Sequence, residues 1–162
     1  YEAFSRVIDS MASQHSKWLK IVGDLPWRED IASLNYILTS YVWQQDHNGY
    51  THQEPGFLNH LATKKSDIAR IYLPADTNTL LCTMHHCLGT KNRINAIVAS
   101  KHPRYQFLNW EQAQKHFKQG ENEMNEGKIS VRKQGEGDQG VMTPDEFATL
   151  VNDKIREMMS EF

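Results

Sequence analysis

The side chains best suited to chemistry are gathered in one short polar stretch, and they are Gln45, His47, Asn48 and His52. The imidazole of His52 or His47 can donate a proton near neutral pH. The two amides can donate hydrogen bonds to a developing oxyanion without adding charge. A histidine taken at random is more often structural, but residues 44–56 (QQDHNGYTHQEPG) contain almost nothing that could fill a core. This stretch is therefore predicted to be a loop with a role in chemistry.

A second group of chemically versatile side chains is Cys82, His85, His86 and Cys87. Cys82 and His86 are four positions apart, on one face of a predicted helix, but a single helix cannot supply the four ligands of a structural zinc site. We therefore predict no metal site here. The two cysteines point to different faces of that helix, so they are expected to be small buried hydrophobic residues and not a disulfide.

The elements around the loop predict an α/β fold with a doubly wound, mostly parallel sheet. Three short apolar runs rich in β-branched residues read as strands, at Ala32–Val42, Ile68–Leu73 and Ile94–Ala99. Helical patterns lie before and between them, at Phe4–Val22, around Phe57–Leu61, and from a cap at Asp76 or Thr77 to Gly89. The polar loop then follows the first strand, and the carboxyl ends of parallel strands are where such sheets bind ligands.

Composition limits the functional classes. The chain has 162 residues and a formal net charge of −2, so no strong field recruits nucleic acid or an anionic membrane. No apolar run approaches the roughly 20 residues that span a bilayer, and the first residues do not resemble a signal peptide, so we expect a cytoplasmic location and no membrane partner. Because the sequence opens inside a helical pattern at Tyr1 without Met, we expect a piece of a longer protein.

The chain changes character near residue 119. After a helix from Asn109 to about Gly120, the sequence predicts a strand at Lys128–Lys133 and a flexible turn at Gly135–Gly140. A capping box formed by Thr143 and Glu146 then opens a final helix. Residues 119–162 are thus predicted to form a strand-turn-helix appendage to a domain formed by residues 1–118.

Residues 1–118 resemble the phosphoketolases. The loop WQQDHNGYTHQEPG at positions 43–56 looks like a signature of that family. The same register holds for YEAF at 1–4, DSM at 9–11, QH at 14–15, KWL at 17–19, YLPAD at 72–76, NTLL at 78–81 and ASK at 99–101.

This resemblance implies the central, pyrimidine-binding domain of an enzyme that cleaves xylulose 5-phosphate or fructose 6-phosphate with inorganic phosphate, giving acetyl phosphate and an aldose phosphate. Its cofactor would be thiamine diphosphate with Mg²⁺. By resemblance, Tyr1 lies against the pyrimidine, and Gln45, Asn48 and His52 face the substrate. His52 is the first choice of acid and His47 the second, while Lys101, which alone would read as a solvated surface charge, binds phosphate.

The same resemblance implies partners and a limitation. The activating glutamate is expected upstream of Tyr1, and a Gly-Asp-Gly type diphosphate motif is not found in the sequence. The chain is therefore expected to be inactive alone and to need the rest of the phosphoketolase and, as in the homodimers of the family, a second subunit.

The tail has a resemblance of its own. Residues 126–133 (EGKISVRK), 137–140 (GDQG) and 142–147 (MTPDEF) look like the end of the anticodon-binding domain of threonyl-tRNA synthetases. This allows an alternative function, a noncatalytic RNA-binding or interaction module that uses Arg132 and Lys133. Nearby carboxylates at Glu121, Glu123 and Glu126 weaken any phosphate field. A third alternative is a folded scaffold without activity.

Overall fold

A three-stranded parallel sheet forms the centre of the first of the two compact units of the chain, residues 1–113. The structure is a computed structural model that describes residues 5–39, 56–100, 102–133 and 137–160. The strands are β1 (Leu34–Thr39), β2 (Ala69–Tyr72) and β3 (Ile94–Ala99). They lie in the order β1-β3-β2, and all six residues of β3 are buried. Because β3 is covered on both faces, all of its residues except Asn95 are apolar, and the predicted bounds of this strand are confirmed.

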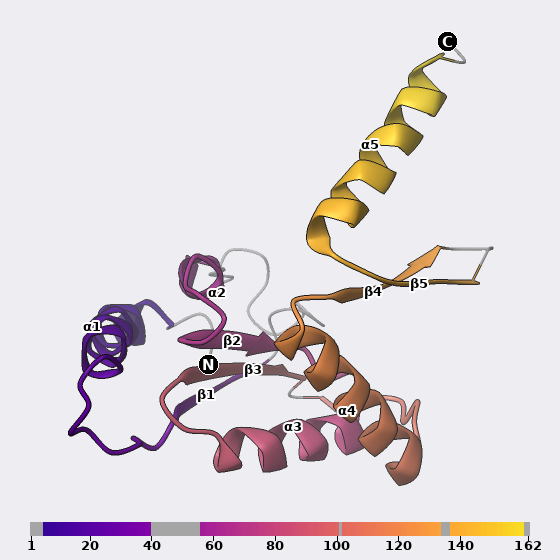
Figure 1. Ribbon diagram of the computed structural model, residues 1–162. Coiled ribbons are helices and arrows are strands. Elements are labelled where there is room, and N and C mark those ends of the chain that lie inside the picture. The colour runs from indigo at the N-terminus through magenta and orange to yellow at the C-terminus, as the bar shows by residue number, and fades with distance from the viewer. Residues whose placement is uncertain (1–4, 40–55, 101, 134–136, 161–162) are drawn as a thin grey trace. The chain divides into compact units, whose positions relative to one another are not determined.

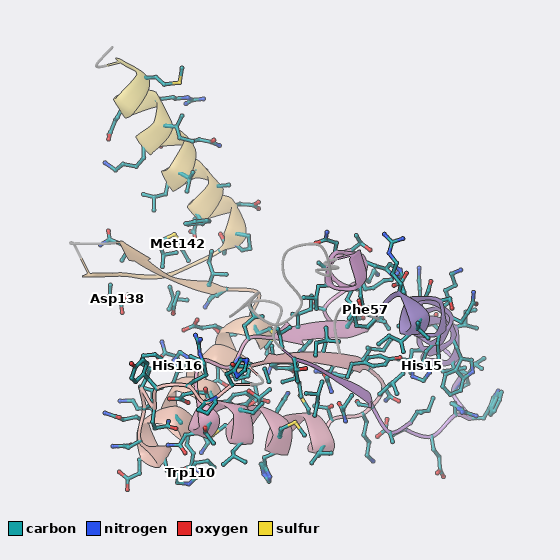
Figure 2. All side chains as sticks on the ribbon, turned by 180° about the vertical axis from the view of Figure 1, so that it is seen from behind. His15, Phe57, Trp110, His116, Asp138 and Met142 are labelled. Carbon is teal, nitrogen blue, oxygen red and sulfur yellow. The ribbon has the colours of Figure 1, made fainter. Side chains whose placement is uncertain are left out.

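Two helices cover one face of the sheet. They are α1 (Arg6–Val22) and α2 (Gly56–Ala62), and Figure 1 shows them on the same side of the strands. The side chains of a strand alternate between its faces, so every second residue of β1 and β3 meets these helices. The core on this face consists of Ala12, Leu19, Leu38, Phe57, Leu61, Ala69, Ile94, Ala96 and Val98. Phe57, labelled in Figure 2, packs edge-to-face against Tyr36 with ring centroids 5.3 Å apart.

The opposite face of the sheet carries α3 (Thr77–Gly89), as Figure 1 shows. Asp76 is its N-cap and forms a capping box with Thr79, which decides between the two predicted caps. The buried side of α3 presents Cys82 and Cys87 as free thiols, so the prediction of small buried residues without a disulfide is confirmed. With helices on both faces of a parallel sheet, the predicted α/β class is also confirmed.

The chain divides into two compact units, residues 1–113 and 114–162, and the division falls within α4 (Trp110–Asn125). The second unit contains the antiparallel hairpin of β4 (Ile129–Lys133) and β5 (Gly137–Met142), followed by α5 (Pro144–Ser160). Figure 2 labels Asp138 and Met142 on this hairpin. The predicted capping box is confirmed, because Thr143 N donates to Glu146 Oε2 over 2.7 Å and Glu146 N donates to Thr143 Oγ1 over 3.3 Å.

Two predictions for the second unit are wrong. The stretch predicted as a flexible turn, Gly135–Gly140, contains the first residues of β5. Gly137 and Gly140 take φ values of 82° and 87°, and glycine adopts such positive values at little cost. This glycine-rich stretch can therefore still pair with β4. The helix expected to end near Gly120 continues to Asn125. A glycine inside a helix costs only about 1 kcal/mol, and Gln119 donates a supporting hydrogen bond to Glu123 one turn later.

Candidate functional site

The predicted site residues fall where the structure gives no description. Gln45, His47, Asn48 and His52 belong to residues 40–55, and Tyr1 and Lys101 also lie outside the described ranges. The described residues on either side of these positions show which helices and strands they connect. Residue 40 follows β1, and residue 56 begins α2. Lys101 lies one residue beyond Ser100, directly after β3.

The two predicted segments leave the sheet at neighbouring positions. β1 and β3 are adjacent and parallel, and their last residues, Thr39 and Ala99, are Cα partners in the register. The chain therefore enters the segment 40–55 and reaches Lys101 from two points that lie side by side at the carboxyl edge of the sheet. This edge is the place where open parallel sheets bind ligands.

Ser100 and His102 fix the backbone on either side of Lys101. The Ser100 hydroxyl donates to the carbonyl of His102 over 3.1 Å, and His102 N donates to the same hydroxyl over 3.2 Å. Such a local serine turn holds a tight change of chain direction without regular secondary structure. The start of the segment after β3 is therefore held by its own hydrogen bonds.

A small cavity of about 90 Å³ opens at the same edge, between the end of β3 and the beginning of α3. Its polar lining includes Ser100, His102 and Arg104 on one side and Asp76 and Thr77 on the other. It is much smaller than the roughly 300–1,000 Å³ of typical ligand pockets. This cavity alone is therefore too small to hold a sugar phosphate.

Asp76 is a buried charged residue at this edge of the sheet. The residue is 5% exposed. Oδ1 accepts from Thr79 N and from Thr79 Oγ1, each over 2.8 Å, and Oδ2 accepts from Phe107 N over 3.0 Å and Leu108 N over 2.9 Å. Burial alone would raise the pKa of Asp76, but these hydrogen bonds outweigh it and lower the pKa to about 2. Asp76 is thus a carboxylate, ionised near neutral pH, that links α3 to residues 107–108.

The cysteine and histidine cluster of α3 has a packing role. The side chain of His86 lies 3.1 Å from the hydroxyl of Tyr72 across the interface of α3 with β2. Burial raises the pKa of Cys87 to about 11, and burial, followed by the charge of Asp76, raises the pKa of Cys82. Across the described ranges, no group of three His, Cys, Asp or Glu side chains is arranged to hold a metal ion.

We predict that neither Cys82 nor Cys87 reacts with a water-soluble disulfide reagent in the folded protein. Both thiols are buried. With a pKa of about 11, only about one Cys87 thiol in a thousand is ionised three pH units lower, and the thiolate is the reactive form. Thiol titration should therefore detect no rapid reaction before denaturant is added, and two thiols afterwards. A rapid reaction of either cysteine in the native protein would contradict the packing described here.

One contact between helices was not anticipated from sequence. Asp9 Oδ1 on α1 lies 2.5 Å from His60 Nδ1 on α2, and the two residues are 51 positions apart. Both side chains are partly exposed, so the pair is expected to contribute little to stability while fixing the relative position of the two helices. The sequence places Asp9 in the DSM motif of the family resemblance, but nothing in the sequence pairs it with His60.

Arg132 and Lys133 are the candidate residues for RNA binding under the alternative function, and carboxylates are found among their described neighbours. The side chains of Arg132 and Lys133 lie outside the described residues, although their backbone belongs to β4. Glu123 accepts hydrogen bonds from Ser130 and Gln119, which lower its pKa, and Glu126 forms an ion pair with Lys128. The synthetase-like reading of the tail stays a prediction.

Comparison with known proteins identifies the origin of the first unit. The sequence profile of the family described as D-xylulose 5-phosphate/D-fructose 6-phosphate phosphoketolase matches residues 1–90 of this chain. The chain belongs to this family. The phosphoketolase resemblance predicted from the loop and its flanking motifs is therefore confirmed.

Curated phosphoketolase relatives match with high identity over a limited length. A probable phosphoketolase of Clostridium acetobutylicum is 63% identical over 120 residues, which is 74% of this chain and 15% of that protein. A probable phosphoketolase of Rhizobium meliloti is 57% identical over the same length. One from Chlorobaculum tepidum is 52% identical over 139 residues, covering 81% of this chain and 18% of that protein. The chain thus spans about 15% of the length of the first relatives.

None of the helices that the structure describes is long and apolar enough to cross a membrane.

Proposed function

We propose that residues 1–118 form the pyrimidine-binding segment of a phosphoketolase and supply substrate-facing side chains to an active site that other parts of the enzyme complete. The proposed reaction cleaves xylulose 5-phosphate or fructose 6-phosphate with inorganic phosphate, giving acetyl phosphate, an aldose phosphate and water. The single observation that supports it best is the register of β1 and β3. Because Thr39 and Ala99 are paired, the polar segment 40–55 and Lys101 start side by side in a chain of this family.

The proposed cofactor is thiamine diphosphate with Mg²⁺, and when bound it supplies the carbanion chemistry of the reaction. The described residues fit such a group in one respect, because the carboxyl ends of β1 and β3 bring two polar segments to a single edge of a parallel sheet. From this chain, Tyr1 would lie against the pyrimidine ring. In this proposal the diphosphate and the metal are held by parts of the enzyme beyond this segment and by a second subunit.

The roles of the loop residues follow from the chemistry of their side chains. His52, or His47 as second choice, would protonate the hydroxyl that leaves the substrate, because an imidazole can be a proton donor near neutral pH. Gln45 and Asn48 would donate hydrogen bonds to substrate oxygen atoms as negative charge develops on them. Lys101 would place a positive charge beside a phosphate group.

A graft into a complete relative tests this proposal. Residues 1–118 replace the matching segment of the Clostridium acetobutylicum phosphoketolase, to which this chain is 63% identical. The isolated 162-residue chain is expected to make no acetyl phosphate from fructose 6-phosphate, phosphate, thiamine diphosphate and Mg²⁺, and the chimera is expected to make it. A chimera that folds, dimerises and binds the cofactor but forms no acetyl phosphate would contradict the proposal.

A further inference from the structure

A basic cavity lies away from the carboxyl edge of the sheet. It has a volume of about 260 Å³ and is lined by Ser16, Lys17 and Lys20 of α1 and by Thr63, Lys64 and Lys65 after α2. Ile68 closes it, one residue before β2 begins at Ala69. Ala69 pairs with Ile94, the first residue of β3, so this part of the cavity adjoins the amino edge of the sheet.

The cavity brings together elements that lie side by side. Figure 1 shows α1 and α2 on the same face, and the contact between Asp9 and His60 links the two helices. Lys17 and Lys20 are three positions apart on α1, which makes them neighbours on one side of the helix. The segment after α2 then adds Lys64 and Lys65 from across the cavity. Four lysines therefore line one cavity in a chain whose net charge is −2.

The lysines of this cavity are available to a ligand. Within the part of the chain that the structure describes, none of the four forms an ion pair with a carboxylate. A shallower hollow of about 420 Å³ shares Lys17 and Lys20 and adds Asp24, which is the single carboxylate among the described residues that line the two spaces. Like charges held close together repel one another, and a bound anion would relieve that repulsion.

The hydroxyl groups of the cavity are already used as donors. Ser16 Oγ donates to the carbonyl of Ser13 over 2.8 Å, and Thr63 Oγ1 donates to the carbonyl of His60 over 2.7 Å. Recognition of an anion is therefore left to the four ammonium groups. Ammonium groups act as point charges without the planar fork of arginine, which suits the oxygens of phosphoryl groups distributed over a compact ligand.

We propose that this cavity is a binding site for a small anion with two phosphoryl groups, with inorganic pyrophosphate as the simplest member of the class. The site is separate from the proposed active site at the carboxyl edge, so this inference is independent of the proposed function. Binding depends on Lys17 and Lys20 on one side and on Lys64 and Lys65 on the other.

The test is calorimetric titration of the 162-residue chain with pyrophosphate at low ionic strength, against sodium chloride of matched ionic strength. The site variants are K17Q/K20Q and K64Q/K65Q. The matched control is K115Q/K118Q, which removes two exposed lysines with the same three-residue spacing on α4. We expect saturable binding to the unaltered chain, about tenfold weaker binding in either site variant, and unchanged binding in the control.

Thermal unfolding followed by tryptophan fluorescence gives a second readout. All four tryptophans of the sequence lie within residues 1–113, so this signal reports on the unit that contains the cavity. Pyrophosphate should raise the transition temperature of the unaltered chain and of the control, and raise it less in each site variant. The proposal is overturned if pyrophosphate shows no saturable binding, if the control pair weakens binding as much as the site pairs, or if neither site pair weakens it.

Discussion

Replacement of His52 by alanine in the phosphoketolase chimera is expected to lower the rate of acetyl phosphate formation by about 10²- to 10⁴-fold, the usual contribution of a general acid or base. Alanine cannot donate the proton that the departing hydroxyl requires. The cofactor should still bind, because His52 is proposed to face the substrate and not the diphosphate. The measurement is the steady-state rate at saturating fructose 6-phosphate and phosphate, with cofactor affinity determined in parallel.

Two histidine controls make this result specific. His47→Ala tests the second choice in the same loop and is expected to have a smaller effect. His85→Ala removes an exposed imidazole from α3 and should leave the rate unchanged. The role assigned to His52 fails if His52→Ala retains the rate within about threefold, and a larger loss in His47→Ala would transfer the role to that residue.

Replacement of Asp76 by asparagine is expected to lower the free energy of unfolding of the first unit by about 3 kcal/mol. Each carboxylate oxygen of Asp76 accepts two hydrogen bonds, one set from Thr79 and the other from Phe107 N and Leu108 N. An amide has one oxygen, so its NH₂ group must face one of these pairs of donors. The variant therefore loses a charge-assisted set of bonds and leaves buried donors unsatisfied.

The stabilisation by Asp76 also depends on pH, and its sign follows from the lowered pKa. Folding lowers the pKa from 3.8 to about 2, so the stabilisation is fully present above about pH 5 and is lost as pH falls through the folded-state pKa of about 2. The shift corresponds to about 2 kcal/mol. This part of the acid dependence should be missing in Asp76→Asn.

Urea unfolding followed by tryptophan fluorescence measures this effect, because all four tryptophans lie in the first unit. Asp67→Asn is the matched control, since Asp67 is an exposed aspartate in the turn before β2. Equal stability of Asp76→Asn and Asp67→Asn would show that the link between α3 and residues 107–108 contributes nothing.

Local sequence signals predict most of the first unit. β3 is a fully buried strand that is apolar except for Asn95, so its composition locates it. The caps at Asp76 and Thr143 satisfy backbone N–H groups within a few residues, and such short-range chemistry is visible in sequence. The sequence does not predict that β1 and β3 are neighbours, because the strand order β1-β3-β2 depends on how the crossover connections pack against the sheet.

Other features depend on contacts that sequence spacing does not reveal. Asp76 reads as a helix cap, but its second pair of donors comes from Phe107 and Leu108, more than 30 positions later. Asp9 and His60 meet only because α1 and α2 lie on the same face. β5 was missed because GDQG offers no alternation of apolar and polar residues, and its pairing with β4 comes from hairpin hydrogen bonds. The predicted residues Tyr1, Gln45, His47, Asn48, His52 and Lys101 fall outside the described ranges and stay predictions.

Two chimeras decide whether the polar segment after β1 carries phosphoketolase chemistry. One keeps residues 1–118 intact, and the other has residues 44–56 replaced by a Gly-Ser linker of equal length. We predict that the first forms acetyl phosphate in a phosphate-dependent reaction, and that the second folds and dimerises but forms none. Equal activity of the two chimeras would show that this segment is not required for the chemistry.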